Sequence, residues 1–280
     1  MAKKEIAKKE EAGLATAAPA PAFLQKSKDE RVGVDQAAKY QTINRIGIVQ
    51  PQSGKQRREE FGVNSFVMFP DGIQVAEPGE PFIGIPLFLY PSWEKWSDYN
   101  DDESATVIES VLNENHEIAR RSKAKATRTE AYGDDNQFNY SYVESINVAI
   151  LVDSGPAKGE IAIVSFNKSD HYVGRQVSTM ISRSDTDIFA RRIEFSTVDR
   201  TDGKNDWHGF KVNNPTEEQG GTWISEDRVE DLLAMHKEAE GAYNANLIVI
   251  NRDDDAGGGS GGGGYGDDGG FTGGDDLPPV

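Results

Sequence analysis

The sequence predicts a β-rich α+β fold, in which antiparallel strands form hairpins beside two or three helices. Residues 138–152 alternate apolar with polar side chains, and the apolar-rich residues 160–166 follow a glycine-containing loop, as the second strand of a hairpin does. An Asp-Gly pair separates two further strand-like runs near residue 200. Residues 169–183 and 226–243 have apolar side chains at helical spacing instead. An enlarged OB-like barrel is one arrangement that such strands can adopt.

Four strands are expected in the first part of the body. They are the apolar-rich runs at residues 41–50, 61–69, 73–76 and 82–90. The turn residues 51–54 and the polar residues 55–58 predict a hairpin tip between the first two runs, and Pro70-Asp71-Gly72 predicts a turn before the third. The prolines of the fourth run favour an edge strand or a bend, because proline has no N–H to donate to a neighbouring strand.

Residues 91–137 form the least regular part of the body. An aromatic and acidic segment at residues 91–103 leads into an expected helix at residues 105–121. A basic stretch follows, and the Gly-Asp-Asp-Asn sequence at residues 133–136 then indicates a loop.

The second half of the body has clearer elements. They are expected in the order strand, strand, helix, strand, strand and helix, at residues 138–152, 160–166, 169–183, 188–198, 207–213 and 226–243. Ser169 or Asp170 can cap the start of the first helix, and Ser225 can cap the second. A last apolar run at residues 246–250 leads us to expect one folded domain over residues 31–252.

Charge is distributed unevenly along the 280 residues, whose formal net charge is −17. Residues 1–30 carry +1 and residues 253–280 carry −7, which leaves −11 on residues 31–252. This balance excludes a uniformly basic, histone-like protein, so any contact with nucleic acid must come from a local basic track. The Ala-, Pro- and Lys-rich arm at residues 1–30 is expected to be disordered, and it is either a solubilising leader or a basic arm that contacts phosphates.

The absence of cysteine excludes disulfides and thiolate metal sites and suits a reducing cytoplasm. The sequence contains no secretory signal and no membrane-spanning stretch, so we expect a cytoplasmic protein (in the host cell, if it is phage-encoded) without a membrane partner. The P-loop, His-Glu-x-x-His and Gly-x-Ser-x-Gly patterns are absent, and the four histidines lack metal-ligand spacing. We therefore expect no enzyme, catalytic residue, metal or cofactor, although the many carboxylates leave a two-metal nuclease open.

Aromatic side chains interleaved with basic ones are a more informative pattern. Recognition of a single strand needs flat rings on which bases stack and cations along the phosphates. One such group lies on the expected hairpin near residue 200. It consists of Phe189, Arg191, Lys204, Trp207, Phe210 and Lys211. Alternation along the strand places Phe189, Arg191 and Phe195 on one face, and the alternative is that the phenylalanines belong to the core.

Three smaller groups are further candidates for contact with DNA. Trp93 and Trp96 lie in the aromatic, acidic segment, which we expect to be a surface platform; a packed corner of the fold is the alternative. A cation cluster, with a solvated charged face as its alternative, consists of Arg120, Arg121, Lys123, Lys125 and Arg128. Arg57 and Arg58 are expected at the first hairpin tip.

Residues 253–280 contain twelve glycines and seven aspartates, and they have too little apolar area to offset chain entropy. They indicate a flexible acidic tail, for which a plain solubility tag or linker is the alternative. Its last residues are Asp275, Asp276, Leu277, Pro278, Pro279 and Val280. This ending resembles that of bacterial and phage single-stranded-DNA-binding proteins, whose tip has the form Asp-Asp-Asp-[Ile/Leu/Val]-Pro-Phe. Pro279 looks inserted, and Val280 stands where that family has Phe.

The resemblance implies a phage-type protein that binds single-stranded DNA with little sequence preference, as a homo-oligomer. It would coat and protect the strand during replication, recombination or promoter opening. The tail would recruit replication, recombination or RNA polymerase proteins through Asp275, Asp276, Leu277, Pro278 and Val280. The body is longer than the short bacterial OB-fold, so an enlarged or unrelated β-rich fold is expected. A viral structural or assembly protein without a DNA-binding role is the alternative.

Overall fold

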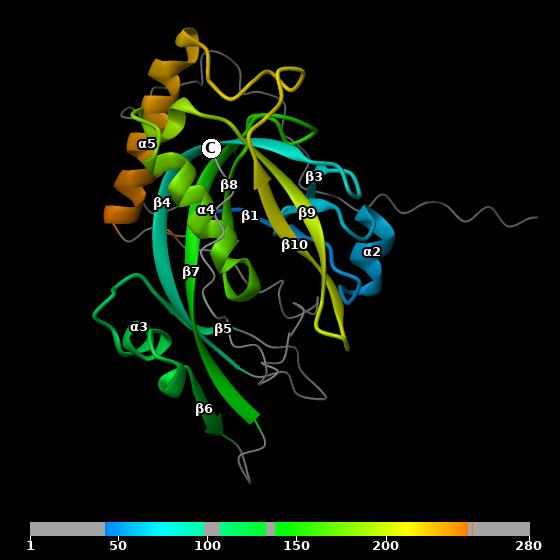
Figure 1. The fold of residues 1–280 in the computed structure, drawn as a ribbon, viewed down its shortest axis with the longest axis vertical. Coiled ribbons are helices and arrows are strands. Elements are labelled where there is room, and N and C mark those ends of the chain that lie inside the picture. Colours follow the sequence, from blue (N-terminus) through cyan, green and yellow to red (C-terminus); the bar gives the residue numbers. More distant parts are fainter. Residues whose placement is uncertain (1–42, 98–106, 133–137, 246–247, 249–280) are drawn as a thin grey trace, which may run out of the picture. The chain divides into compact units, whose positions relative to one another are not determined.

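The computed structural model describes residues 43–97, 107–132, 138–245 and 248 (Figure 1). All of them belong to one compact unit, Thr42–Val280. The expected arm at residues 1–30 and the expected tail at residues 253–280, with its tip residues, lie outside the described residues.

Ten strands in the described part of the chain form one sheet, which is antiparallel except where β1 pairs in parallel with β8. Eight of them follow the order β10-β9-β4-β7-β8-β1-β2-β3, while β5 pairs with β4 and β6 pairs with β7. The strands are β1 (Arg45–Ile48), β2 (Phe66–Phe69), β3 (Ile73–Ala76), β4 (Phe82–Trp96), β5 (Val107–Val111), β6 (Thr129–Tyr132), β7 (Phe138–Val152), β8 (Ile161–Phe166), β9 (Ile193–Thr201) and β10 (Asp206–Asn213).

Helices complete the β-rich α+β fold that the sequence predicts. The α-helices are α2 (Lys55–Phe61), α3 (Glu117–Ser122), α4 (His171–Ser182) and α5 (Val229–Asn244). Short 3₁₀ segments are η3 (Lys125–Thr127), η5 (Lys168–Asp170), η6 (Ile188–Ala190) and η7 (Glu226–Arg228). Helices α4 and α5 confirm the two helices expected in the second half, and β7, β8 and the β9–β10 hairpin confirm its strands.

The paired strands β4 and β7, each fifteen residues long, run the length of the sheet (Figure 1). At one end, which we call the proximal end, β9 pairs with residues 82–84 of β4, and β8 pairs with residues 146–151 of β7. At the other, the distal end, β5 pairs with residues 93–96 of β4 and β6 pairs with residues 138–141 of β7. The two strands therefore connect two differently built regions.

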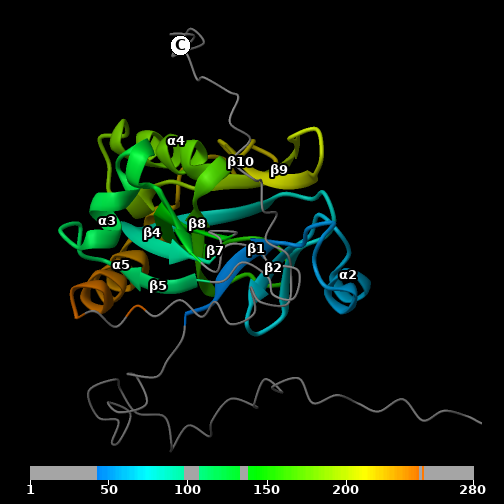
Figure 2. The same cartoon turned by 90° about the horizontal axis from the view of Figure 1, so that it is seen from below.

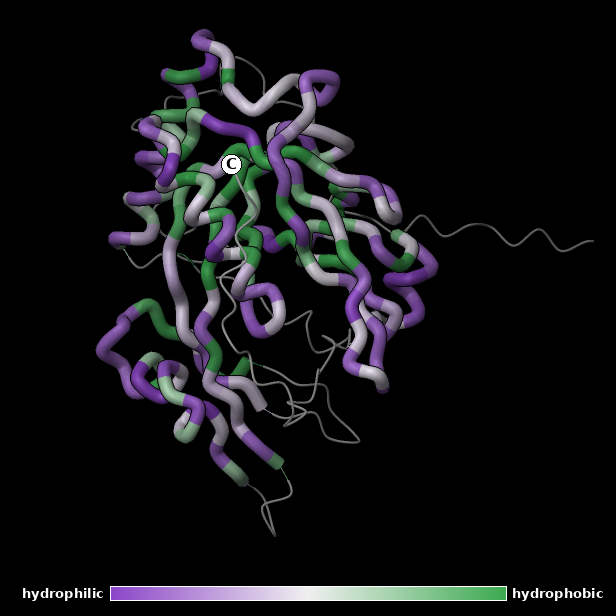
Figure 3. Tube along the Cα trace, viewed as in Figure 1, coloured by the Kyte–Doolittle hydropathy of each residue, from purple (hydrophilic) through white to green (hydrophobic). Residues whose placement is uncertain are grey.

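Helices α4 and α5 cover opposite faces of the proximal end, and Figure 2 shows the sheet between them. Because side chains alternate along β7, Ile150 packs in the cluster of α4, whereas Leu151 packs in the cluster of α5 that contains Leu232. The α4 helix lies close to the strands at Gly174, where an added Cβ would lie 2.9 Å from Cβ of both Ile146 and Phe166. Figure 3 shows the apolar residues concentrated in this region.

Phenylalanine rings from β2, near one end of the strand order, pack against rings from β10 at the other end. Phe82 of β4 stacks on Phe195 of β9 at 4.9 Å, and Phe66 of β2 lies 5.7 Å from Phe210 of β10. At the edge of β10, the Gln50 side chain donates to the His208 carbonyl and accepts from the His208 N–H, each at 2.8 Å. The sheet is nevertheless open, because β10 pairs with β9 and with no other described strand. The closed OB-like barrel is therefore not formed.

Three expectations about single elements are wrong. Residues 107–111, expected in a helix, form the edge strand β5, because their β-branched side chains pair with β4. The expected hairpin tip at residues 55–58 is the start of helix α2. The third is the edge strand at Pro86: this strand is central, and a register shift between Pro86 and Phe88, which fits the alternative of a bend, accommodates the proline.

Candidate nucleic-acid interface

The distal end carries a group of aromatic rings that is only half-buried. Alternation along β7 places Phe138, Tyr140 and Tyr142 on one face, and β6 brings Tyr132 opposite Phe138. The rings of Tyr132 and Tyr140 stack with centroids 4.0 Å apart and planes 8° from parallel. Lys95 of β4 places its Nζ 3.9 Å from the Tyr140 centroid. We call Lys95, Tyr132, Phe138 and Tyr140 the distal aromatic group.

Helix α3 brings the predicted cation cluster to the same region. Its buried residues Ile118 and Ala119 pack on Trp93 and Tyr142, because only this side of the helix is apolar. The His116 side chain caps its start by accepting from the Ile118 N–H at 3.4 Å. Residues 117–132 contain five cationic and two acidic side chains, so this part of an otherwise acidic body is positively charged. The segment η3 then contacts β6 next to the distal aromatic group.

Two of the five cations, Arg121 and Arg128, are half-buried. Arg121 lies 3.0 Å from a carboxylate oxygen of Glu130 and 4.4 Å from the Tyr142 ring. Arg128 is half-buried and donates from Nε to the Ser122 carbonyl at 3.3 Å. Burial, followed by the hydrogen bond that Tyr142 donates to Glu130, raises the pKa of Tyr142 to about 12, and the same bond lowers the pKa of Glu130.

The other three cations of the cluster are exposed. These are Arg120, Lys123 and Lys125. Arg120 lies on the side of α3 away from its buried residues. The pKa of Glu144 is lowered by His171 and further by the charge of Lys123, which follows the last helical residue. The cluster therefore contains two half-buried arginines, Arg121 and Arg128, and three cations whose side chains are exposed to solvent.

The expected surface platform at Trp93 and Trp96 is wrong, and the alternative of a packed corner is right. The two residues are 4% and 3% exposed. Strand β4 continues through Trp96 between β5 and β7, and α3 covers Trp93, so both rings are in the interior. The rings of this region that remain partly at the surface are instead the half-buried ones of the distal aromatic group. The alternation of Phe138 and Tyr140 along a predicted strand places both rings on one face, but alternation alone does not tell a face at the surface from a buried one.

The predicted group near residue 200 is divided by the fold. Phe189 and Phe210 are buried in the core, as the alternative held. Phe189 lies in η6 and packs with Leu87, whereas Phe195 packs in the cluster of α4, so they do not share a face. Trp207 is half-buried, and Lys204 and Lys211 are exposed.

Arg57 and Arg58 lie on α2, which follows a loop tied to the β9–β10 hairpin. Gln50 bonds to His208, and Gln52 donates to the Asp206 carbonyl at 2.6 Å. Arg58 is exposed, while the Arg57 guanidinium lies 4.6 Å from the Phe69 centroid. The loop that precedes Arg57 and Arg58 is therefore tied to β10, the strand that carries Trp207 and Lys211.

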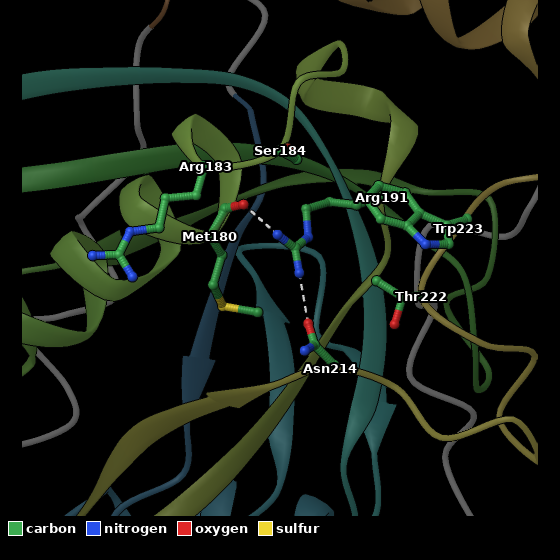
Figure 4. Close-up of a pocket in the computed structure, with 7 residues that line it drawn as sticks. All are labelled: Met180, Arg183, Ser184, Arg191, Asn214, Thr222 and Trp223. Atoms are coloured by element: carbon green, nitrogen blue, oxygen red, sulfur yellow. Dashed lines mark hydrogen bonds between the residues drawn. The ribbon is translucent and has the colours of Figure 1, made fainter. Parts of the chain in front are cut away.

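Arg191 is buried at 8% exposure in a pocket at the end of α4 (Figure 4). Its guanidinium donates to the Met180 carbonyl and, at 2.6 Å, to Oδ1 of Asn214. The ring centroid of Trp223 lies 5.9 Å from it, and the Trp223 residue is 55% exposed. Trp223 was not among the predicted site residues, since nothing in its local sequence places it beside Arg191.

The sequence was compared with protein families, curated proteins and solved structures. The family of Pam3 phage gp34-like proteins matches residues 9–244. The chain belongs to this family. The match includes every described strand and helix and ends before the expected acidic tail. No curated protein and no solved structure matches the chain.

Residues 43–97, 107–132 and 138–245 contain neither a cluster of metal-ligating side chains nor a membrane-spanning helix. No group of three or more His, Asp or Glu side chains there is placed to hold a metal ion. None of the helices in these ranges is long and apolar enough to cross a membrane.

Proposed function

We propose that this phage-family protein binds single-stranded DNA with little sequence preference, and that the distal end of β4 and β7 is its main contact surface. The observation that carries the proposal is the position of α3, which places exposed cations beside half-buried, partly stacked rings. In this role the protein coats and protects the strand during phage replication, recombination or promoter opening.

The chemistry of the distal end suits a flexible strand. Stacking of a base on an aromatic ring contributes roughly 1–3 kcal/mol and tolerates any base, because every base has a π-face. The distal aromatic group contains such rings, and Lys95 of β4 adds a cation over the Tyr140 ring. Arg120, Lys123 and Lys125 supply charges for the phosphates that follow.

The acidic remainder of the body limits adhesion to polyanions elsewhere. Residues 31–252 carry −11 and residues 117–132 carry +3, so the remainder of the body carries −14 and the positive segment is the favoured approach for a strand. The acidic tail at residues 253–280 would compete with DNA for this segment and recruit replication, recombination or RNA polymerase proteins through its tip. Both roles of the tail rest on the resemblance of the tip to single-strand binders.

Fluorescence anisotropy of a labelled oligo-dT strand tests the proposal, with duplex DNA and oligo-rU measured under the same salt. We expect tight binding to oligo-dT and much weaker binding to duplex. The affinity should fall with salt by about 0.7 log units per log unit for each phosphate contacted. Equal affinity for single strand and duplex would overturn the proposal. Ordered assembly in the absence of DNA, together with no binding, would favour an assembly protein instead.

Matched variants locate the surface. Tyr140→Ala should weaken oligo-dT binding, because Tyr140 holds the Tyr132 ring and the Lys95 cation in position, while Tyr172→Ala on α4, which removes a ring that is 46% exposed, should not. Lys123→Ala should reduce the salt dependence, while Lys237→Ala on α5, on the opposite face of the sheet, should leave it unchanged. Deletion of residues 253–280 should preserve or strengthen DNA binding and abolish partner recruitment.

A further inference from the structure

A pocket of about 500 Å³ lies where residues 180–191 meet residues 214–223. The end of α4, the strand that begins near Arg191 and the segment before η7 all contribute side chains, as Figure 4 shows. The lining residues are Met180, Arg183, Ser184, Arg191, Asn214, Thr222 and Trp223. No part of the distal end contributes to it.

The backbone holds Trp223 in place although its ring is exposed. Trp223 forms an antiparallel bridge with Arg191, supported by hydrogen bonds from the Arg192 N–H to the Thr222 carbonyl at 2.7 Å and from the Ile224 N–H to the Ala190 carbonyl at 3.1 Å. Asp153 anchors both sides of this bridge, since it pairs with Arg192 at 2.8 Å and Arg228 at 2.9 Å. Because the backbone on both sides of Trp223 is already fixed, only the Trp223 side chain has to lose conformational entropy when a flat ligand stacks on its ring.

Arg191 brings an unbalanced positive charge into the pocket. Both of its described acceptors, the Met180 carbonyl and the Asn214 amide oxygen, are neutral. Its Nε has no hydrogen-bond partner, and no described carboxylate lies within ion-pair distance of it. A buried cation without a counter-charge is costly, and an anionic ligand in the pocket would offset that cost.

Arg183 adds a second cation at the mouth of the pocket. It is exposed at the C-terminal end of α4, and Asp185 and Asp187, the nearest acidic residues in the sequence, form no ion pair with it or with Arg191 within the described ranges. In Figure 4 the Arg183 guanidinium points away from Arg191, whose two terminal nitrogens already donate to the Met180 carbonyl and Asn214. The two arginines therefore attract a phosphate through their charge, and the exposed Arg183 side chain is the one that can donate to it. The Trp223 ring beside them suits a base.

We propose that this pocket is a nucleotide subsite, in which Trp223 stacks a base, Arg183 binds the adjoining phosphate and the buried charge of Arg191 attracts it. The ligand is a single nucleotide unit, supplied either by a bound DNA strand or by a free mononucleotide. The strand-bound form rests on the function proposed above. It adds a second point of contact outside the distal end.

Tryptophan fluorescence of the full chain tests the subsite. Trp93 and Trp96 are buried, so a Trp207→Phe variant leaves Trp223 as the tryptophan most open to a ligand. Oligo-dT, thymidine monophosphate, thymidine and inorganic phosphate are titrated separately into this variant. We expect quenching by oligo-dT and by the monophosphate, weaker quenching by thymidine, and competition between phosphate and the monophosphate. No quenching by any nucleotide would overturn the subsite.

Substitutions at the two exposed positions separate this proposal from the function of the distal end. Trp223→Ala should weaken oligo-dT binding roughly 5- to 150-fold, the equivalent of about 1–3 kcal/mol for one stacked base. Arg183→Ala should lower the salt slope by about 0.7, while Arg175→Ala, an exposed cation elsewhere on α4, should not. Melting temperatures of the variants confirm that they fold.

The outcomes can be told apart. Tight oligo-dT binding that is unaffected by Trp223→Ala and Arg183→Ala, together with no quenching by the monophosphate, would overturn the subsite and leave the proposed function standing. Quenching by the monophosphate without any binding of oligo-dT would support a mononucleotide site and overturn the proposed function. Binding of oligo-dT that is weakened by both Trp223→Ala and Tyr140→Ala would support a strand that spans the two sites.

Discussion

The two ends of the β4–β7 pair use the same two strands for different purposes. At the proximal end, side chains on both faces are apolar and covered, by α4 on one face and α5 on the other. At the distal end, one face carries stacked tyrosines, a lysine between rings, and a short helix whose outer side is basic. Figure 3 shows the change from apolar to hydrophilic residues between the two ends.

The difference suggests a division between stability and recognition along one pair of strands. Burial of apolar area at the proximal end supplies most of the driving force for folding. The distal end then projects as an extension of strands that are already fixed, so its rings and cations are held in place at little additional entropic cost. Substitutions at the two ends should therefore have separable effects, on stability at one and on DNA binding at the other.

The largest effect on stability is expected at the proximal end. Phe82→Ala removes a ring that is fully buried and stacked on Phe195, and it should destabilise the protein by roughly 3–5 kcal/mol. The matched distal change, Phe138→Ala, removes a half-buried ring and should cost far less. Chemical denaturation measures both. Equal losses would show that the distal end contributes as much to folding as the proximal core does.

A pH-dependent effect is also expected at the proximal end. Burial raises the pKa of Asp170 from near 3.8 to about 6, against the lowering effects of Arg200 and the Phe210 N–H. Since the folded state holds this proton more tightly than the unfolded state, the contribution of Asp170 to stability is greatest below about pH 4 and is lost as pH rises through about 6. Wild type should lose on the order of 2–3 kcal/mol relative to Asp170→Asn across this window.

The distal carboxylate Glu130 should behave in the opposite way. Its pKa is lowered, first by the hydrogen bond from Tyr142, so its contribution is present above its unfolded pKa and is lost as pH falls through the lower folded value. Thermal unfolding of wild type, Asp170→Asn and Glu130→Gln from pH 3 to 7 compares the two ends. The same sign of pH dependence in both difference curves would contradict this assignment.

A smaller effect is expected where the open sheet is held at its β10 edge. Gln50→Ala removes two hydrogen bonds to the backbone of His208 and should cost about 1–2 kcal/mol. The His208 amide should exchange with solvent faster, while the amides of β6 at the distal end should not change. Hydrogen exchange followed by mass spectrometry measures both. Uniformly faster exchange would show that the two ends open together.

The smallest effect on stability is expected from the three exposed cations. The combined variant Arg120→Ala, Lys123→Ala and Lys125→Ala should change the free energy of unfolding by less than about 0.5 kcal/mol per substitution. The salt slope of oligo-dT binding should nevertheless fall by about 2, or 0.7 for each lost phosphate contact. Anisotropy titrations at several salt concentrations measure the slope. An unchanged slope would place the binding surface elsewhere.

Local pattern was sufficient to predict the elements that alternate cleanly or have a long apolar stripe. Strand β7, the β9–β10 hairpin and helices α4 and α5 are of this kind. It failed at β5, because a five-residue edge strand depends on its partner β4 more than on its own residues. It also failed to separate buried from exposed aromatics, since Trp93 and Tyr140 have similar polar neighbours in sequence and differ only in what packs on them.

The sequence by itself determined that the chain has a β-rich α+β body, an uneven charge and an acidic, glycine-rich ending, because these follow from composition and local periodicity. Only the tertiary structure decided which rings remain at the surface and which cations lie beside them. The Arg191–Trp223 pocket and the distal aromatic group each join residues from separate segments. Such neighbourhoods arise from strand pairing and helix packing over long separations, which no local pattern in the sequence encodes.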